Sequence, residues 1–77
     1  MGLKILFFGQ LTDFVKKSEI QTENFKDISE LMNYLETEFP KLKKTEYSVS
    51  LNRNIINENT SLSDNDEIAL LPPFSGG

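Results

Sequence analysis

The sequence predicts an α+β domain, in which a mixed sheet of four to five strands packs on one main helix. Three observations support this. Residues 28–39 carry an apolar stripe at helical spacing, short β-prone or alternating runs occupy most of the remaining chain, and 77 residues without a linker leave room for one domain. Because a single helix covers one face of a sheet, the economical arrangement lays the stripe across that face. We assign residues 1–71 to this domain and residues 72–77 to an extended, flexible C-terminal tail.

The chain opens with the β-prone run LKILFF, which ends at Gly9. Leu11, Phe14 and Val15 then lie at the i, i+3, i+4 spacing of a helix, which predicts a short helix over about residues 10–17. Residues 18–24 have one apolar anchor, Ile20, among polar neighbours, as is typical of a weak edge strand.

The clearest expected element is the main helix, over about residues 28–39. Asp27 is a good N-cap and Glu30 follows three residues later, as in a capping box, in which the two side chains satisfy each other's backbone donors. Pro40 disfavours helical geometry at the residue before it. The apolar stripe comprises Ile28, Leu31, Met32, Leu35 and Phe39.

Three further strands complete the expected order of β, short helix, β, helix, β, β, β. After the basic segment KLKK, which we interpret as solvated, Tyr47, Val49 and Leu51 alternate with Ser48, Ser50 and Asn52. Arg53–Asn54 predicts a turn into Ile55–Ile56, and the segment SDND predicts a turn before a last strand at 67–71.

The first and last strands are apolar on both faces. In the first strand, Ile5 and Phe7 should face one side of the sheet and Leu6 and Phe8 the other. In the last strand, Ile68 and Leu70 should face one side and Ala69 and Leu71 the other. Strands of this kind are usually covered on both sides, yet the chain has only one substantial helix. Either a partner binds a second apolar surface that includes Phe8 and Leu71, or the short helix or a loop folds over it.

Composition narrows the classes of function. Twelve acidic and eight basic residues give a net charge of -4, which disfavours nucleic acid and anionic membranes as partners. Without histidine or cysteine there is no side chain that titrates near neutrality and no thiolate metal site, so we expect no metal and no enzymatic activity of its own. Because the chain lacks cysteine, a start like a signal peptide and a stretch of membrane-spanning length, we expect a cytoplasmic location. Asp64, Asp66 and Glu67 are the remaining acid–base candidates, but their turn-like surroundings favour a solvated position.

The C-terminal residues PPFSGG suggest a use for the chain end. Pro72 and Pro73 cannot continue a strand ladder, and an extended exit at about 3.1 Å per residue could project the carboxylate about 19 Å from the domain. Phe74 is a candidate anchor, and Gly76 and Gly77 can pass through a narrow channel. An ionised carboxylate reacts only after activation, and the chain has no phosphate-binding loop of its own.

The ending DNDEIALLPPFSGG, the opening KILFFGQL and the segment SVSLNRNII resemble the small, sulfur-carrying subunits of molybdopterin synthase, which have the ubiquitin-like β-grasp fold. The resemblance implies that Gly77 is adenylated by a ubiquitin-activating-like adenylyltransferase that uses ATP. A sulfur donor protein then converts it to a thiocarboxylate. Gly76 and Gly77 would enter the active site of the large subunit, where the sulfur helps to form the molybdopterin dithiolene from a cyclic pyranopterin precursor.

The same resemblance implies that this chain is a non-catalytic subunit that binds no cofactor. It implies a tail, Pro72, Pro73, Phe74, Ser75 and Gly76, that threads into partners, and a partner interface of Phe8, Ile55, Leu71, Asp66 and Glu67. Two positions depart from the family pattern. Phe74 stands where a small aliphatic residue is usual, and Asn65 stands where glycine is frequent, although asparagine tolerates the left-handed turn conformation.

Alternatives remain open. A sulfur carrier of thiamine synthesis or a ubiquitin-like protein modifier would also end in Gly-Gly, although thiamine carriers generally lack the Pro-Pro pair. A non-covalent β-grasp adaptor would use the apolar face alone, and a small hydrolase would use the three acids of the last turn.

Overall fold

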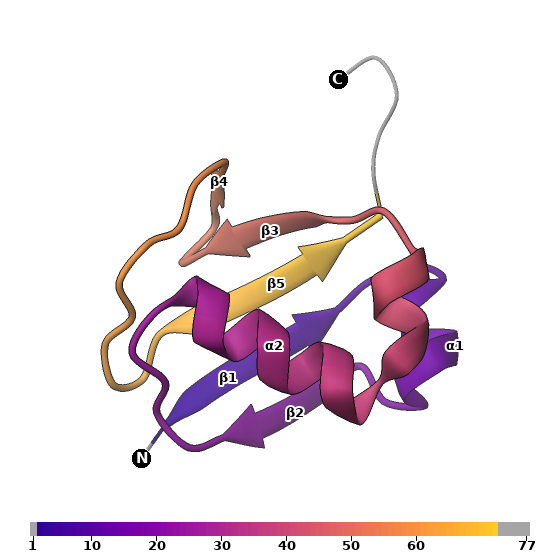
Figure 1. The fold of residues 1–77 in the computed structure, drawn as a ribbon, viewed down its shortest axis with the longest axis horizontal. Coiled ribbons are helices and arrows are strands. Elements are labelled where there is room, and N and C mark those ends of the chain that lie inside the picture. The colour runs from indigo at the N-terminus through magenta and orange to yellow at the C-terminus, as the bar shows by residue number, and fades with distance from the viewer. Residues whose placement is uncertain (1, 73–77) are drawn as a thin grey trace.

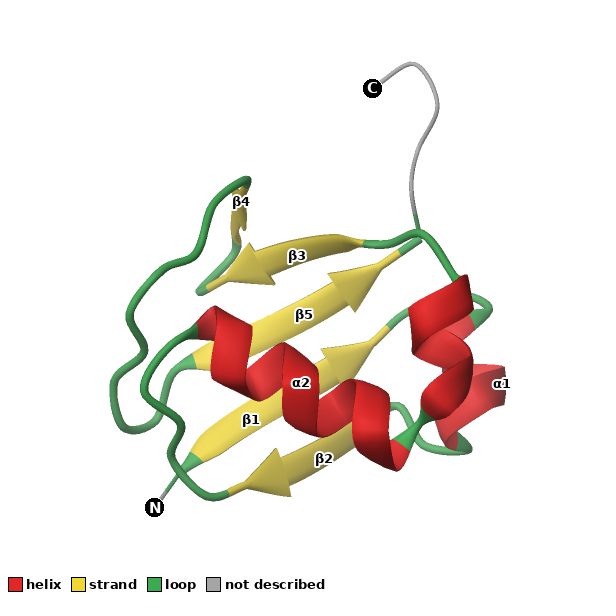
Figure 2. Ribbon diagram, viewed as in Figure 1, coloured by secondary structure: helices red, strands yellow, loops and turns green. Residues whose placement is uncertain are grey.

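A computed structural model describes residues 2–72 and shows two layers, a five-stranded mixed sheet and helix α2 lying across one of its faces (Figures 1 and 2). No helix within these residues is long and apolar enough to cross a membrane. In chain order the elements are β1 (Leu3–Phe7), α1 (Leu11–Val15), β2 (Glu19–Thr22), α2 (Ile28–Glu38), the 3-10 helix η1 (Pro40–Lys44), β3 (Ser48–Leu51), β4 (Asn54–Ile56) and β5 (Glu67–Leu71). The predicted α+β class and order of elements are confirmed, with η1 as an addition.

The strand order is β2-β1-β5-β3-β4, so that the first and last strands of the chain are neighbours in the middle of the sheet. β1 and β5 run parallel, with Ile5 opposite Ile68 and Phe7 opposite Leu70. The β2–β1, β5–β3 and β3–β4 pairs are antiparallel. The parallel pair brings the C-terminal ends of β1 and β5 to the same end of the sheet (Figure 1).

The core lies between the sheet and α2. Period-two alternation points one set of strand residues at the helix, and the stripe of α2 faces them, because apolar side chains on both elements must leave water together. Met32 and Phe39 of the stripe pack against the core and are partly buried. The buried apolar residues are Leu3, Ile5, Phe7, Leu11, Val15, Ile28, Leu31, Leu35, Leu42, Ile68 and Leu70.

The start of α2 follows the prediction except for one bond. The Asp27 carboxylate accepts a hydrogen bond from the Glu30 amide at 3.0 Å, as an N-cap should. The Glu30 carboxylate reaches one residue further back than in a capping box, because it accepts from the Lys26 amide at 3.1 Å. α2 ends at Glu38, with Phe39 as its C-cap.

Three local predictions need correction. α1 spans only Leu11–Val15, because Lys16 adopts a left-handed C-cap conformation with φ 68°; the side chain of Phe14 lies outside what the structure describes. The basic segment is the helix η1, whose lysines are exposed as expected but whose Leu42 is only 1% exposed. It starts at Pro40, whose fixed φ suits a first helical position.

The hairpin between β3 and β4 also differs from the prediction, which placed the turn at Arg53–Asn54. The turn residues are Asn52 and Arg53, with φ of 49° and 73°, and Asn54 already pairs with Leu51. Positive φ at both central positions is the signature of the type I′ turn, whose twist matches that of the strands. The register therefore shifts by one residue, which places Ile55 opposite Ser50.

Candidate functional site

The face of the sheet opposite α2, here called the outer face, carries the second set of alternating side chains. The pairings place Leu6 beside Ala69, Ala69 beside Ser50, and Ser50 beside Ile55, in one row across four strands. Phe8 and Leu71 follow two residues beyond Leu6 and Ala69, in the direction of the chain exit. The predicted division of β1 and β5 between the two faces is confirmed.

The outer face is apolar and partly open. Phe8 is 44% exposed and Ile55 is 56% exposed, while Leu6, Ala69 and Leu71 are half-buried. α1 does not conceal this face, because its Leu11 and Val15 belong to the buried core. Ser50 is the exception to the expected exposure of the β3 serines: it is 5% exposed, since its cross-strand neighbours are Ala69 and Ile55. Among the described residues, no element covers Phe8 or Ile55.

The chain leaves the sheet at one end of this face. Leu71 closes β5 and Pro72 follows it directly, close to Gly9 at the end of β1. Phe8, Leu71 and Pro72 therefore lie at the same end of the sheet. Pro73, Phe74, Ser75, Gly76 and Gly77, which the sequence assigns to the tail, lie outside the described residues.

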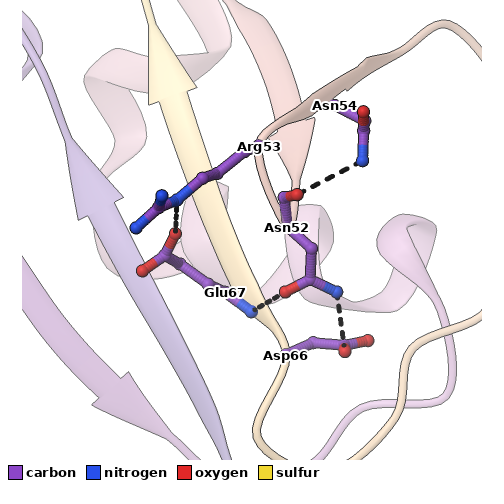
Figure 3. A network of polar contacts seen from close by, with 5 residues as sticks. All are labelled: Asn52, Arg53, Asn54, Asp66 and Glu67. Carbon is purple, nitrogen blue, oxygen red and sulfur yellow. Dashed lines mark hydrogen bonds and ion pairs between the residues drawn. The ribbon is translucent and has the colours of Figure 1, made fainter.

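At the opposite end of β5, a network of hydrogen bonds joins the β3–β4 turn to the start of the strand (Figure 3). The Asn52 side chain donates to the Asp66 carboxylate at 3.0 Å and accepts from the Glu67 amide at 3.0 Å. The Asn52 amide also donates to the Glu67 carbonyl at 2.7 Å. Arg53 Nε lies 3.8 Å from Glu67 Oε1, in an exposed ion pair of small energetic weight.

The three acids of this region stabilise local structure. Asp66 accepts from the Ser63 amide at 2.8 Å and closes the turn before β5, in which Asn65 has the expected left-handed conformation with φ 71°. Asp64 accepts from the Gly2 amide at 2.7 Å. None of the three carboxylates lies in an apolar pocket that would suit a general acid, and Asp66 and Glu67 lie at the end of β5 away from Leu71.

One titrating group departs strongly from its usual behaviour. Burial raises the pKa of Tyr47, and its hydroxyl, which donates to Glu36 at 2.9 Å, is held further in the protonated form by that carboxylate. This contact fastens the start of β3 to α2 and therefore stabilises the helix side of the sheet. Within residues 2–72, no group of three or more acids could hold a metal ion.

Sequence reasoning missed one residue of this region, Gly9. It was interpreted only as the end of a strand, whereas it lies so close to Pro72 at the chain exit that a Cβ built on it would meet the proline ring. The position of Gly9 after a β-prone run carries no signal for a contact with residue 72, because only the parallel pairing of β1 and β5 brings the two together.

A small mixed sheet with one covering helix, parallel first and last strands and an open apolar face defines the class: this is the ubiquitin-like β-grasp fold. The chain belongs to the ThiS family, whose model matches residues 5–77.

Three relatives refine the comparison. A chain in the complex of subunits 1 and 2 of the molybdopterin-converting factor of Helicobacter pylori matches with a TM-score of 0.76 and 34% identity over 100% of both chains. The molybdopterin synthase sulfur carrier subunit of Mycobacterium tuberculosis is 28% identical, over 97% of this chain and 96% of its own. Small archaeal modifier protein 1 of Methanosarcina acetivorans has a TM-score of 0.81 and 26% identity, over 97% of this chain and 95% of its own.

Proposed function

We propose that this chain is the sulfur-carrying small subunit of a molybdopterin synthase. In this proposal the Gly77 carboxylate is adenylated, converted to a thiocarboxylate, and used to deliver sulfur to a pterin precursor bound by a larger catalytic subunit. The chain holds no cofactor and performs no catalysis alone, and it works in the cytoplasm. The observation that carries the proposal is the common location of the chain exit at Pro72, the exposed Phe8 and the half-buried Leu71.

The relatives support the choice of partner. The Helicobacter pylori structure is a complex of subunits 1 and 2, and the chain matches the whole of a subunit in it. An apolar, partly exposed sheet face is a suitable surface for such a subunit, because interface cores are poor in charged side chains. Phe8, Ile55 and Leu71 would form its centre and Glu67 would lie on its rim. The Asp66 carboxylate already accepts hydrogen bonds from Asn52 and Ser63, so it would stabilise the rim indirectly through these bonds.

The proposed chemistry needs two outside proteins. A ubiquitin-activating-like adenylyltransferase would bind ATP, and a Gly77 carboxylate oxygen would attack the α-phosphorus with release of pyrophosphate. Sulfide (HS⁻) supplied by a donor protein would then attack the acyl carbon, so that a C–S bond forms as the C–O bond to AMP breaks and the sulfide proton is lost. Activation is required because an ionised carboxylate offers no good leaving group at neutral pH. Gly76 and Gly77 suit a narrow channel because they lack a Cβ.

Intact-mass measurement tests this directly. The chain is incubated with the adenylyltransferase, ATP and a sulfur source, and the expected product carries one sulfur in place of one oxygen at Gly77. Thiocarboxylated protein is then supplied to purified large subunit and pterin precursor, and a dithiolene product is expected. Thiocarboxylate without dithiolene product would reject the molybdopterin assignment and keep the carrier class.

The protein modifier is the second candidate, favoured by the 26% identity to small archaeal modifier protein 1. A modifier would join its Gly77 carboxyl to amino groups of other proteins after the same adenylation. Lysine-linked conjugates of the chain in cells, detected by mass spectrometry of the Gly-Gly remnant, would favour this function. The Pro-Pro pair after the last strand argues against a third candidate function, the sulfur carrier of thiamine synthesis.

An extra alanine after Gly77 separates the carriers from a non-covalent adaptor. The added residue displaces the carboxylate by about 3.5 Å, and a displacement near 1 Å can already cost about a hundredfold in rate. We expect adenylation and sulfur transfer to fall below detection while the unfolding midpoint is unchanged. An adaptor would bind its partner equally well with or without the alanine.

A further inference from the structure

Gly9, two residues after β1, lies close to Pro72, the first residue after β5. Gly9 has φ of +60°, and a Cβ built on it would lie 2.6 Å from Pro72 Cγ and 3.4 Å from Pro72 Cδ. Carbon atoms in contact are usually about 3.5–4.0 Å apart. No side chain larger than hydrogen fits at Gly9 while the proline ring stays where it is.

The register of the two strands explains why these residues meet. β1 and β5 pair in parallel from Lys4 opposite Glu67 to Phe7 opposite Leu70, a constant offset of 63 residues. Continued by two residues, this offset places Gly9 opposite Pro72. The contact is therefore fixed by the central pairing of the sheet.

The hydrogen bonds change partners at this point. The Phe8 amide still donates to the Leu70 carbonyl at 3.1 Å, and the next bond of a regular parallel ladder would run from the amide of residue 72 to the Phe8 carbonyl. Proline has no N–H, and the Phe8 carbonyl instead accepts from Leu11 at 3.2 Å, at the start of α1. The ladder stops at Pro72 and the proline ring packs on Gly9.

We propose that Gly9 is a positioning residue for sulfur transfer: by leaving room for the Pro72 ring, it sets the direction in which the C-terminal tail leaves the sheet. This rests on the proposed function, in which Gly77 must reach a reactive position in a partner enzyme. A Cβ at residue 9 would push the ring aside and redirect the tail at its first residue. The apolar face that docks on the partner would be unchanged.

The first test measures adenylation of Gly9→Ala under single-turnover conditions with excess adenylyltransferase and ATP. We expect the rate to fall by about 10- to 100-fold, the order seen when reacting groups are misplaced by about 1 Å. Affinity for the adenylyltransferase, measured without ATP, should stay within about twofold, because the outer face is intact. Gly9→Asn should behave in the same way. It serves as the second variant if Gly9→Ala unfolds, because asparagine tolerates positive φ.

Two further variants separate tail direction from damage to the turn. Thr12→Ala removes the 2.8 Å hydrogen bond from Thr12 Oγ1 to the Gly9 carbonyl, so it loosens the same turn without placing an atom against Pro72. Its adenylation rate should match the wild type. Pro72→Ala removes the ring, and in that background Gly9→Ala should slow adenylation by less than about threefold, because the coupling partner is absent. An equal loss in both backgrounds, or no loss in either, would overturn the proposal.

A measurement without any partner distinguishes this proposal from the proposed function. A nitroxide on Asp13→Cys, in α1, broadens the amide signals of Gly76 and Gly77 according to their average distance. Gly9→Ala should change that broadening, and Gly9→Ala with Pro72→Ala should change it less. Unchanged broadening would reject the role of Gly9. If the broadening changes as expected but the wild-type chain is never adenylated, sulfur carriage is rejected. Gly9 would then still be the residue that directs the tail.

Discussion

The same strands contribute side chains to both faces of the sheet, and the two sets of side chains differ in burial. On the helix side, Ile5, Phe7, Ile68 and Leu70 are fully buried against α2 and form the centre of the core. On the outer face, Phe8 and Ile55 remain exposed, and the apolar residues between them, Leu6, Ala69 and Leu71, are only half-buried. The difference shows that apolar strand residues do not all serve folding. Those under the helix stabilise the domain, whereas those opposite it are available to a partner.

The pair Leu70 and Leu71 gives the strongest test of this comparison, because adjacent residues point to opposite faces. Leu70→Ala should lower the free energy of unfolding by about 2–5 kcal/mol, as for a fully buried leucine. Leu71→Ala should cost less than about half of that, because the side chain is already in partial contact with water. Urea denaturation measures both.

Binding should show the reverse order for the two variants. Leu71→Ala should weaken affinity for the large subunit by about tenfold or more, as expected for an apolar residue near the centre of an interface. Leu70→Ala, studied well below its unfolding midpoint, should bind nearly as the wild type does. Equal effects of the two variants on stability and on binding would contradict the separation of the faces.

The next prediction concerns the hairpin that carries Ile55 on the outer face. Asn52→Ala removes two side-chain hydrogen bonds, to Asp66 and from Glu67, and places alanine at positive φ, so we expect a loss of about 1–3 kcal/mol in unfolding free energy. Asn52→Gly removes the same bonds but accepts the backbone conformation, and it should lose less. If both lose equally, the left-handed conformation contributes nothing measurable.

A smaller effect is expected from pH on the helix side. Hydrogen bonds from the Glu30 amide and from the Asn59 side chain lower the pKa of Asp27 below its ordinary value of 3.8. A carboxylate with a lowered folded pKa stabilises the native state above the unfolded pKa and loses that contribution as pH falls through the folded one. Thermal unfolding of wild type and Asp27→Asn should therefore differ most above pH 4 and converge in stronger acid. Asparagine remains a good N-cap, so the variant isolates the charge.

The smallest effect, and the only gain, is expected at Arg53. This residue has φ of 73° at the second central position of a type I′ turn, where glycine is preferred. Arg53→Gly should raise the unfolding free energy by about 0.5 kcal/mol, since relief of the left-handed strain exceeds the added chain entropy and a weak ion pair. A decrease, measured by urea denaturation, would mean that the pair with Glu67 contributes more than exposed pairs usually do.

The sequence was informative where a pattern depends on near neighbours. Helix α2, its Asp27 cap and the two-sided character of β1 and β5 follow from spacing alone, because helical and strand periodicities are local. The turn at Asn52 was displaced by one residue in the prediction, because both Asn52 and Asn54 are plausible turn residues and cross-strand pairing selects between them. Leu42 gave no periodic signal, since one apolar residue among lysines does not form a pattern.

The site was predicted in the same uneven way. Strand parity predicted that Phe8 and Leu71 share a surface, and the family resemblance added Ile55. The structure places Ile55 and the β5 side chains on the same face, and their contact with a partner stays a prediction. Gly9 could not be recognised, because its partner is 63 residues away along the chain and the contact exists only in the assembled sheet. Short-range chemistry was therefore accessible from the sequence, whereas relations between distant strands required the fold.

The central pairing of β1 with β5 determines whether an incompletely synthesised chain can fold. Because the middle of the sheet joins the first strand to the last, a chain that ends before β5 lacks a central strand and cannot bury Ile5 and Phe7 as the complete sheet does. Contacts between such distant segments also slow folding, because a long loop must be closed before they form. The residues that would carry the reactive end in the proposed function follow directly after that strand. Under the proposed function, a folded chain has therefore been synthesised through β5, and incomplete copies, left unfolded, are open to proteolysis before they can compete for a partner enzyme.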